Sequence, residues 1–380
     1  MNQLVVNSYL SCEQIKLMKE QITVLGIMSG SSCDGVDAAV CSFSMHDAVL
    51  DYKLLGKASF KFPDQLKDAL KQAANKSTAE LNVLNTNFSS FLVKHIFDFF
   101  QANGKTDYIA SHGHTVLHAP DDGYTLQLGN GALISAGTKT PTIVDFRSQD
   151  IACGGQGAPL APLADKQLFG GYDFYLNLGG IVNVSHVNNQ STIGFDIAPC
   201  NQMLNALSNV IGLDYDSEGK LAAQGLINEA LLEKLLSSDY LKAPYPKSLD
   251  NSWVRDNYTE PLLTYEDTIS NKLHTAVEFI AITIRNGLQL ISNKEKVKLE
   301  GGTVFCTGGG AFNKYMMDRI IYHCSQLGVK VIIPKSEIIE YKEAMLMALM
   351  GYLRIIRKPN CIASVTGADK DCSAGVIYYP

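Results

Sequence analysis

One local pattern occurs twice in this chain: an apolar strand, a glycine turn and a second apolar strand. The pattern covers residues 22–43 and 174–186, and its turns are Ser29-Gly30-Ser31-Ser32-Cys33-Asp34-Gly35 and Gly179-Gly180. Apolar, β-branched runs on both sides of small turn residues predict β-hairpins. Helical segments follow each hairpin, so the sequence predicts two α/β halves of related topology.

Helices are predicted where apolar residues recur with a period of 3.6. They cover residues 64–74, 78–101, 268–290, 311–326 and 341–356. Further strands are predicted at residues 49–55, 108–111, 124–128, 142–145, 192–196, 304–307 and 329–333. The segment 150–162 is rich in Gly, Ala and Pro and predicts a connection between the halves. Residues 213–262 show no clear pattern.

Composition excludes several classes of protein. Hydrophobic residues make up 46% of the 380 residues, which is too many for a disordered chain. The net charge of −6 disfavours a nucleic-acid binder that relies on a basic face. No apolar run approaches the roughly 18 residues that a membrane helix needs. The chain has nine cysteines, an odd number, and no C-x-x-C pair, which disfavours a disulfide framework or a structural zinc site. With no secretory leader evident, we expect a reduced, cytoplasmic protein.

The common nucleotide-binding motifs are incomplete. Gly104-Lys105-Thr106 would end a P-loop, but Phe99 stands where that motif requires glycine. The segment Gly308-x-Gly310-x-x-Asn313 lacks the third glycine of a dinucleotide fingerprint. No G-x-S-x-G nucleophile elbow occurs. These absences weaken P-loop, Rossmann and α/β-hydrolase interpretations.

The first glycine turn could bind an anion, because small residues let backbone amides approach a ligand closely. Ser31 and Ser32 would add hydroxyl donors. Asp34 and Asp37 would repel phosphate unless a divalent cation lay between, which suggests Mg²⁺. An ordinary hairpin with acidic turn residues explains the same segment equally well.

Two later glycine turns allow the same interpretation. Gly179-Gly180 is flanked by Asn177 and Asn183, although taken alone it is more typical of a plain hairpin. Gly308-Gly309-Gly310 connects a strand to a helix, and three successive glycines need a reason because they cost backbone entropy. A ligand lying on the turn is one reason, and a tight strand–helix connection is another.

Three histidines fall within seven residues, at His112, His114 and His118. On a strand, His112 and His114 would face the same side. That placement could ligate a metal ion, or it could bind a polar substrate by hydrogen bonds.

Three charged residues are candidates for catalysis or substrate binding. Asp196 follows an apolar strand and precedes a proline-started helix, where open α/β sheets place ligands; it could equally cap that helix. Glu343 begins an apolar helix, where an acid is also favoured by the helix dipole. Arg147 could pair with Asp145 or Asp150, or hold an anionic substrate.

Ten motifs follow in order between residues 24 and 368. They are Gly26-x-Met28-Ser29-Gly30-Ser31-Ser32-x-Asp34-Gly35-x-Asp37, Ser111-His112-Gly113-His114-Thr115-Val116-x-His118-x-Pro120, Leu126-Gln127-Leu128-Gly129, Val144-Asp145-Phe146-Arg147, Gly154-Gly155-Gln156-Gly157-Ala158-Pro159-Leu160, Asn177-x-Gly179-Gly180-Ile181-x-Asn183, Asp196-x-x-Pro199-x-Asn201, Thr307-Gly308-Gly309-Gly310-Ala311-x-Asn313, Glu343-Ala344 and Val365-Thr366-Gly367-Ala368. Together they resemble the anhydro-N-acetylmuramic acid kinase family.

The resemblance implies an actin-like fold, with two ribonuclease H-like α/β domains and a nucleotide cleft between them. We expect an N-terminal domain at 1–150, with residues 355–380 packing back on it, and a C-terminal domain at 151–354. The implied cofactors are ATP and Mg²⁺, the latter at Asp34 and Asp37. The implied nucleotide-binding residues are Gly30, Ser31, Ser32, Cys33, Asp34, Gly35, Val36, Asp37, Gly179, Gly180, Gly308, Gly309 and Gly310.

The resemblance also implies an unusual kinase reaction in murein-sugar recycling. Water opens the internal bond of 1,6-anhydro-N-acetylmuramic acid while O6 accepts the γ-phosphoryl group of ATP, giving N-acetylmuramic acid 6-phosphate and ADP. By position, Asp196 matches the general base and Glu343 assists it. Thr115, Gly129 and Arg147 lie in segments that resemble the sugar-binding side. A homodimer is expected, with no nucleic-acid or membrane partner.

This chain departs from the family pattern at three places. In the first turn, at Ser32 or its neighbour, the family usually has Thr, and the hydroxyl is kept. His114 stands where the family usually has Gln, and Ile197, Ala198 and Cys200 replace a hydroxyl residue and two glycines after Asp196. Two alternatives stay open: a metal-dependent hydrolase built on His112, His114 and His118, and a non-catalytic actin-like protein that binds ATP and sugar.

Overall fold

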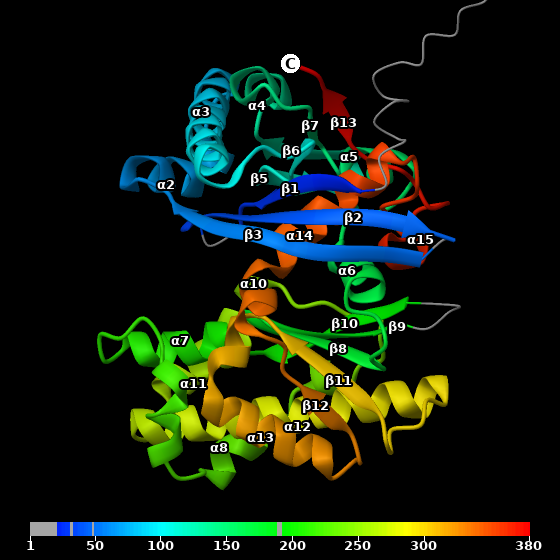
Figure 1. The fold of residues 1–380 in the computed structure, drawn as a ribbon. Helices are drawn as coiled ribbons and strands as arrows, with labels where there is room; N and C mark the ends of the chain where they lie inside the picture. The colour runs from blue at the N-terminus through cyan, green and yellow to red at the C-terminus, as the bar shows by residue number, and fades with distance from the viewer. Residues whose placement is uncertain (1–20, 31–32, 48, 188–191) are drawn as a thin grey trace, which may run out of the picture. The chain divides into compact units, whose positions relative to one another are not determined.

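The computed structural model describes residues 21–30, 33–47, 49–187 and 192–380, and two compact units divide the chain. The first unit contains the chain up to Leu168 together with Tyr341–Pro380. The second unit contains Phe169–Glu340. Figure 1 shows both units as α/β structures, each built on its own twisted sheet.

The sheet of the first unit has the strand order β13-β7-β4-β1-β2-β3. Its strands are β1 (Ile22–Met28), β2 (Gly35–His46), β3 (Val49–Lys61), β4 (Tyr108–Ser111), β7 (Thr142–Val144) and β13 (Val376–Tyr378). The first three strands are antiparallel, β4 is parallel to β1 and β7 is parallel to β4. A separate two-stranded sheet pairs β5 (His114–Ala119) with β6 (Tyr124–Leu128).

Successive side chains of β1 point to opposite faces of this sheet, and this alternation decides which helix packs on which face. Leu25 and Ile27 share a buried core with residues of α3. Val24 and Gly26 contact α14 from the other face. The helices of this unit are α2 (Asp64–Lys71), α3 (Thr78–Asn103), α4 (Gly131–Thr138), α5 (Ser148–Ala152), α6 (Ala161–Gln167), α14 (Ser336–Ile355) and α15 (Ala363–Thr366).

The sheet of the second unit has the order β10-β9-β8-β11-β12. Its strands are β8 (Phe174–Leu178), β9 (Ile181–Val187), β10 (Thr192–Pro199), β11 (Thr303–Thr307) and β12 (Lys330–Ile332). Again three antiparallel strands are followed by two parallel ones. When the strands of each sheet are numbered by their order in the sequence, both sheets have the strand order 3-2-1-4-5. Strand β13 is an additional strand at the edge of the first unit's sheet.

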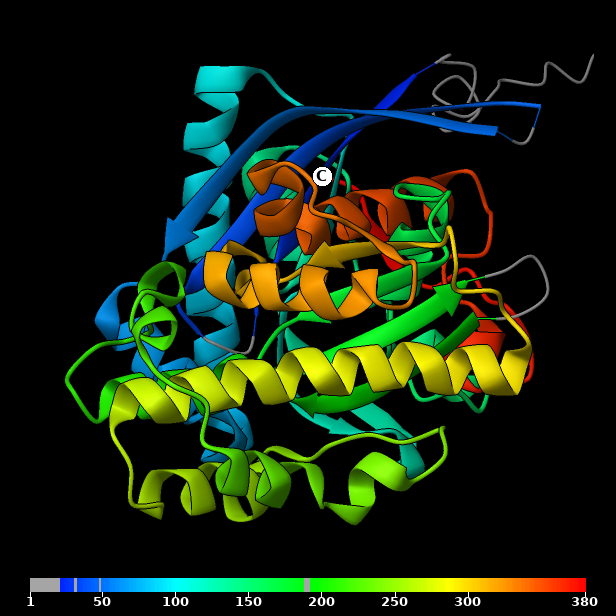
Figure 2. The same cartoon turned by 90° about the horizontal axis from the view of Figure 1, so that it is seen from below.

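The core of the second unit centres on α12 (Ile269–Glu295), which runs along the sheet in Figure 2. Its apolar side chains join those of β8, β9 and β10 in one buried cluster. The other helices are α7 (Asn201–Asn209), α8 (Glu229–Leu236), α9 (Asp239–Lys242), α10 (Asn251–Val254), α11 (Glu260–Thr264) and α13 (Lys314–Ser325). Several of them lie in residues 213–262, where the sequence showed no clear pattern.

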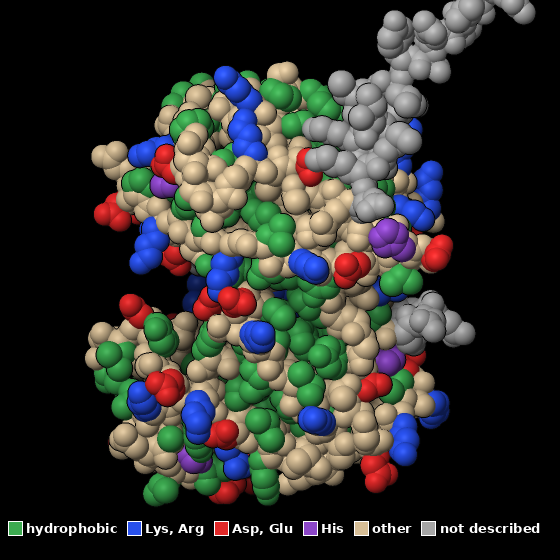
Figure 3. Space-filling model, viewed as in Figure 1, with side chains coloured by type: hydrophobic (Ala, Val, Ile, Leu, Met, Phe, Trp, Pro, Cys, Tyr) green, Lys and Arg blue, Asp and Glu red, His purple; other side chains and the backbone are tan. Residues whose placement is uncertain are grey.

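The repeated strand order confirms the predicted fold class, two ribonuclease H-like α/β domains. The compact units nevertheless end at 168 and 340, whereas the predicted domain limits are 150 and 354. The difference arises because α6 and most of α14 belong with the first unit. Gly26 of β1, for example, packs against Ala344 and Ala348 of α14. A helix long and apolar enough to cross a bilayer is absent from the described ranges. On the face shown in Figure 3, basic and acidic side chains are interspersed within each unit.

Candidate functional site

The first glycine turn connects β1 to β2, as predicted. Ser31 and Ser32, two of the predicted phosphate-binding residues, lie outside the described residues. Cys33 has a φ of +55°, and its amide donates to the Gly30 carbonyl at 3.4 Å. A Cβ atom on Gly35 would lie 2.3 Å from the Phe60 carbonyl oxygen of β3, so strand packing alone requires glycine there.

The two acidic residues of this turn have different partners. Asp34 is largely exposed and forms an ion pair with Lys67 at 2.5 Å. Asp37, on β2, accepts a hydrogen bond from Ser59 Oγ at 2.6 Å, and burial raises the pKa of its carboxyl. Mg²⁺ in kinases is held by one or two carboxylates together with substrate phosphates. Asp37 fits that role better than Asp34, whose charge Lys67 already offsets.

His112 and His114 do not face the same side of one strand, as the alternation of side chains along a strand had predicted. His112 and Gly113 lie between β4 and β5, and Gly113 has a φ of +76°, so His112 and His114 are not on one continuous strand. His114 lies close to Ser29 Oγ at 3.2 Å, and His118 lies close to Thr125 Oγ1 at 3.1 Å. Within the described ranges, no group of three potential metal ligands contains a histidine. The hydrolase alternative therefore has no structural support.

His112 instead positions Arg147. Arg147 Nε donates to His112 Nε2 at 2.9 Å, so the other ring nitrogen carries the proton and donates to the Gly113 carbonyl at 3.0 Å. Burial, followed by the charge of Arg147, lowers the pKa of His112 to about 4. The imidazole is therefore neutral at physiological pH.

Arg147 also donates Nη1 to the Gly157 carbonyl at 2.6 Å. Among the described residues, Nε and Nη1 alone have acceptors, and the predicted pairing with Asp145 or Asp150 is not formed. Burial lowers the pKa of the guanidinium, which still stays charged because its ordinary pKa is above 12. A fixed, half-buried arginine with unused N–H groups can bind a carboxylate.

The other two predicted sugar-side residues belong to the small sheet of β5 and β6 or directly follow it, and β5 begins two residues after His112. Gly129 has a φ of +130°, and a Cβ atom there would lie 3.3 Å from the Gly113 Cα. Its amide donates to Asn85 Oδ1 at 2.7 Å. Thr115, on β5, accepts a long hydrogen bond of 3.5 Å from Gln127 Nε2.

Glu343 belongs to the same unit as Arg147 and Asp37. It lies in α14 and keeps an exposed surface. Desolvation by surrounding protein atoms raises the pKa of its carboxyl; Asp37 adds to this effect, and Lys342 and Arg147 oppose it. The first unit thus brings together one arginine and two carboxylates.

Asp196 belongs to the second unit and lies within β10, not at its end. The strand continues to Pro199, with a register irregularity between Asp196 and Ala198, and α7 is capped at Cys200. The alternative role of helix cap for Asp196 is therefore wrong. Asp196 Oδ2 accepts from the Leu249 amide at 2.9 Å, while burial raises the pKa of the carboxyl.

The turn Gly179-Gly180 connects β8 to β9 and contacts the start of α7. The Gly180 carbonyl accepts from the Cys200 amide at 2.8 Å, and the Gly179 carbonyl accepts from the Asn201 amide at 3.1 Å. Neither glycine has a positive φ. The nearest atom to a Cβ on Gly180 would be 3.7 Å away, so packing does not require glycine there.

The three glycines after β11 have different structural reasons. Gly308 has a φ of +87°, and a Cβ there would lie 2.7 Å from Asn177 Oδ1. A Cβ on Gly310 would lie 2.7 Å from Met316 Cε. In contrast, a Cβ on Gly309 would meet nothing within 4 Å. Two glycines are thus explained by packing, and Gly309 is not.

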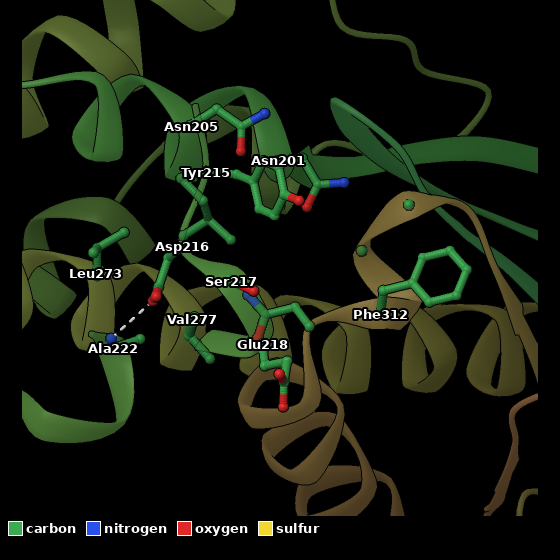
Figure 4. Close-up of a pocket in the computed structure, with 14 residues that line it drawn as sticks. Asn201, Asn205, Tyr215, Asp216, Ser217, Glu218, Ala222, Leu273, Val277 and Phe312 are labelled. Carbon is green, nitrogen blue, oxygen red and sulfur yellow. Dashed lines mark hydrogen bonds between the residues drawn. The ribbon is translucent and has the colours of Figure 1, made fainter. Parts of the chain in front are cut away.

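Gly309 and Gly310 line a cavity of about 420 Å³ in the second unit, shown in Figure 4. Its lining combines apolar residues of α7 and α12, the exposed aromatic rings of Tyr215 and Phe312, and several amides and carboxylates. Asp216 has a structural role there, because its carboxylate accepts from the Leu221 and Ala222 amides, both at 2.9 Å. The size and mixed lining suit a small organic ligand.

Sequence reasoning missed several of these residues. Tyr215 and Phe312 carry no motif, and Tyr215 lies in the segment without a readable pattern. Tyr240, whose hydroxyl donates to the Asp196 carbonyl at 2.7 Å, and Leu249 come from the same segment. The only sequence signal that could have singled out Tyr215 is its position as an aromatic residue between Asp214 and Asp216.

Two sheets with the same ribonuclease H-like strand order define an actin-like α/β protein. A family model for anhydro-N-acetylmuramic acid kinase matches residues 22–380. A relative with that name from Hydrogenovibrio crunogenus is 32% identical over 94% of this chain and 98% of its own length. Relatives from Haemophilus influenzae (33% identical, 93% and 97% covered) and Francisella tularensis subsp. novicida (32%, 95% and 100%) carry the same name. The chain therefore belongs to the anhydro-N-acetylmuramic acid kinase family.

Among solved structures, component A of (R)-2-hydroxyglutaryl-CoA dehydratase from Acidaminococcus fermentans is similar at a TM-score of 0.45 and 14% identity. That match covers 88% of this chain and 99% of the other. A similarity this distant supports no statement about function.

Proposed function

We propose that this chain is an ATP-dependent kinase that hydrolytically opens 1,6-anhydro-N-acetylmuramic acid and phosphorylates its O6. Family membership over nearly the whole chain supports the reaction class. The structural observation that carries the proposal is Asp196, a half-buried carboxylate with a raised pKa that is held by a backbone amide. A general base works best when its pKa is moved toward the working pH.

In this reaction Asp196 takes a proton from the water that attacks the anomeric carbon. The bond between the anomeric carbon and O6 breaks, and O6 forms a bond to the γ-phosphorus as ADP leaves. Ring opening passes through oxocarbenium-like charge, which a second carboxylate can stabilise. Glu343 has that role, and its neighbour Arg147 binds the carboxylate of the sugar's lactyl group.

The nucleotide is bound by the glycine turns and by the cavity of the second unit. The phosphates lie against the turns at Gly30, Cys33–Asp37, Gly179 and Gly180, and the adenosine part lies against Gly308–Gly310 and the cavity. Bound Mg²⁺ would neutralise phosphate charge during transfer, with Asp37 as its protein ligand. The overall acidity of the chain makes these local donors necessary.

The pH dependence of kcat/KM should report the state of Asp196. Protonated Asp196 cannot accept a proton, so activity falls as the pH drops through its pKa. Because burial raises that pKa, the acid limb should lie above the ordinary aspartate value of about 3.9. The limb should persist in Glu343→Gln, since Asp196 is intact there. A limb that vanishes in Glu343→Gln would assign the titration to Glu343 instead.

Gly309→Ala should weaken ATP binding without changing stability. The added methyl group meets no protein atom within 4 Å and strains no positive φ, so the free energy of unfolding should not fall. It does point toward the proposed nucleotide position, and we expect the Kd for ATP to rise by about 10-fold, measured by calorimetry. Gly194→Ala, in β10 of the same unit, has only ordinary contacts at 3.8 Å and is the matched control. Unchanged ATP affinity in Gly309→Ala would place the nucleotide elsewhere.

We infer from the family that the protein is a cytoplasmic homodimer. Sedimentation at micromolar concentration tests the dimer, and a monomer at all concentrations contradicts it. The alternative of a non-catalytic ATP and sugar sensor has no support in the comparisons, because the matching relatives carry the name of a kinase. That candidate predicts ATP binding without turnover of any anhydro-sugar.

A further inference from the structure

Three potential metal ligands meet in the first unit, and none of them has a role in the proposed reaction. The ligand atoms of Asp150, Cys361 and Cys372 all lie within 4.8 Å of one another, and all three residues are buried. They form the one group of three or more His, Cys, Asp or Glu residues with this proximity in the part of the chain that the structure describes. Asp150 comes from α5, and the two cysteines come from the C-terminal segment.

The backbone holds the two cysteines opposite each other. Cys361 and Cys372 form an isolated antiparallel bridge in which each amide donates to the other's carbonyl, at 3.1 and 3.2 Å. The same segment is tied to α5, because the Asp369 amide donates to the Cys153 carbonyl at 2.9 Å. The placement of the thiols is therefore fixed by main-chain contacts and not by flexible loops.

A fourth ligand adjoins this group. Cys153 is the C-cap of α5, three residues after Asp150, and its side chain interacts with that of Cys372. It is only half-buried, so it offers a route from solvent to the other three residues. Two residues separate Asp150 from Cys153, as two residues separate the paired ligands of many structural zinc sites.

We propose that Asp150, Cys153, Cys361 and Cys372 form a site for a thiophilic divalent cation, best suited to Zn²⁺. Three thiolates and one carboxylate are ligand types that zinc accepts, and four ligands match its tetrahedral preference. A disulfide would use two sulfurs and leave Asp150 without a role in the cluster. A cation would use all four groups and offset the negative charge that they bring into a buried place.

Neighbouring groups hold the Asp150 carboxylate by hydrogen bonds, as the groups around a metal site hold its ligands. One carboxylate oxygen accepts from the Gly157 amide at 2.8 Å, and the other accepts from Thr366 Oγ1 at 2.7 Å. The Gly157 carbonyl in turn accepts from Arg147. The bound cation would therefore fix α5, the Gly157 loop and the C-terminal segment together, and so hold Arg147 in place.

The test is zinc binding by the full-length protein, independent of any kinase assay. Protein purified under reducing conditions is loaded with Zn²⁺, freed of excess metal, and analysed by mass spectrometry for zinc per chain. We expect about one equivalent, and a cobalt-loaded sample should show a thiolate-to-cobalt charge-transfer band. Cys372→Ser should raise the Kd for zinc on the order of 100-fold. Cys41→Ser, which changes a buried cysteine of β2 outside the cluster, should leave zinc binding unchanged.

Cys153→Ser provides a second variant, because this half-buried position tolerates substitution better than Cys361 or Cys372. It should retain the fold and weaken zinc binding. Three results would overturn the proposal: less than about a tenth of an equivalent of zinc with all thiols titratable, equal loss of zinc in Cys41→Ser, or a Cys361–Cys372 disulfide in the unreduced wild-type protein.

Discussion

Asp196→Asn should lower kcat by about 10²–10⁴-fold while leaving the fold and the ATP affinity intact. Asparagine keeps the side-chain shape and can still accept the hydrogen bond from the Leu249 amide, but it cannot take a proton from water. Steady-state kinetics with ATP and the anhydro-sugar, together with calorimetric ATP titration, measure the two effects separately.

Burial raises the pKa of the Asp196 carboxyl, and this direction predicts how Asp196→Asn changes the stability of the protein. A carboxyl whose pKa is raised in the folded state favours folding when protonated, and that contribution is lost as the pH rises through the folded-state pKa. At neutral pH the ionised form is therefore a cost, and the neutral amide should not lower the free energy of unfolding. Asp239→Asn, at a fully exposed carboxylate in α9, is the matched control and should retain wild-type kcat. Near-normal turnover by Asp196→Asn would remove Asp196 from the role of base.

Gly26→Ala should reduce the free energy of unfolding by about 3 kcal/mol and impair catalysis as well. A Cβ atom on Gly26 would lie 2.0 Å from the Ala344 carbonyl oxygen and 2.4 Å from the Ala348 amide nitrogen. Both are backbone atoms of α14, so the helix must move away from β1. Ala344 follows Glu343 directly, and the movement would displace that carboxylate. Urea unfolding and kcat measured on the folded fraction check the two parts of this prediction.

Gly56→Ala is the control for the Gly26 substitution. Gly56 also lies in a strand of the first unit, but the nearest atom to a Cβ there would be Phe99 Cζ at an ordinary 3.5 Å. The change should alter the free energy of unfolding by less than about 1 kcal/mol. If Gly26→Ala is no more destabilising than Gly56→Ala, then α14 does not pack on β1 as described.

The hairpins, the long helices and most strands could be predicted because their apolar periodicity is local. Ile22–Met28 and Phe174–Leu178 agree with the predicted strands at both ends. Residues 213–262 could not be predicted, because their short elements are held by contacts with residues far along the chain. The Leu226 and Asn228 amides, for example, donate to Asn271 Oδ1 and Thr275 Oγ1 of α12. The histidine prediction was wrong because Gly113, with its positive φ, interrupts the strand pattern that alternation assumes.

Candidate residues were easiest to find where a motif surrounds them, as at Asp196 and Gly308–Gly310. The partners that orient the candidate residues lie far away in sequence. Leu249, which holds Asp196, belongs to no motif, and the motif that contains His112 gives no sign of its contact with Arg147. Residue spacing also disfavoured a zinc site, because no C-x-x-C pair exists. The cluster at Asp150 draws its ligands from segments about 200 residues apart, a proximity that only the fold creates.

The central claim is that ring opening and phosphoryl transfer occur in one reaction, and the mass of the product tests it most directly. Purified protein is incubated with ATP, Mg²⁺ and 1,6-anhydro-N-acetylmuramic acid, and the sugar product is analysed by mass spectrometry. We expect a product that has gained one phosphoryl group and one water, formed in step with ADP. A product that has gained phosphate without water, or water without phosphate, would show that the two steps are not coupled.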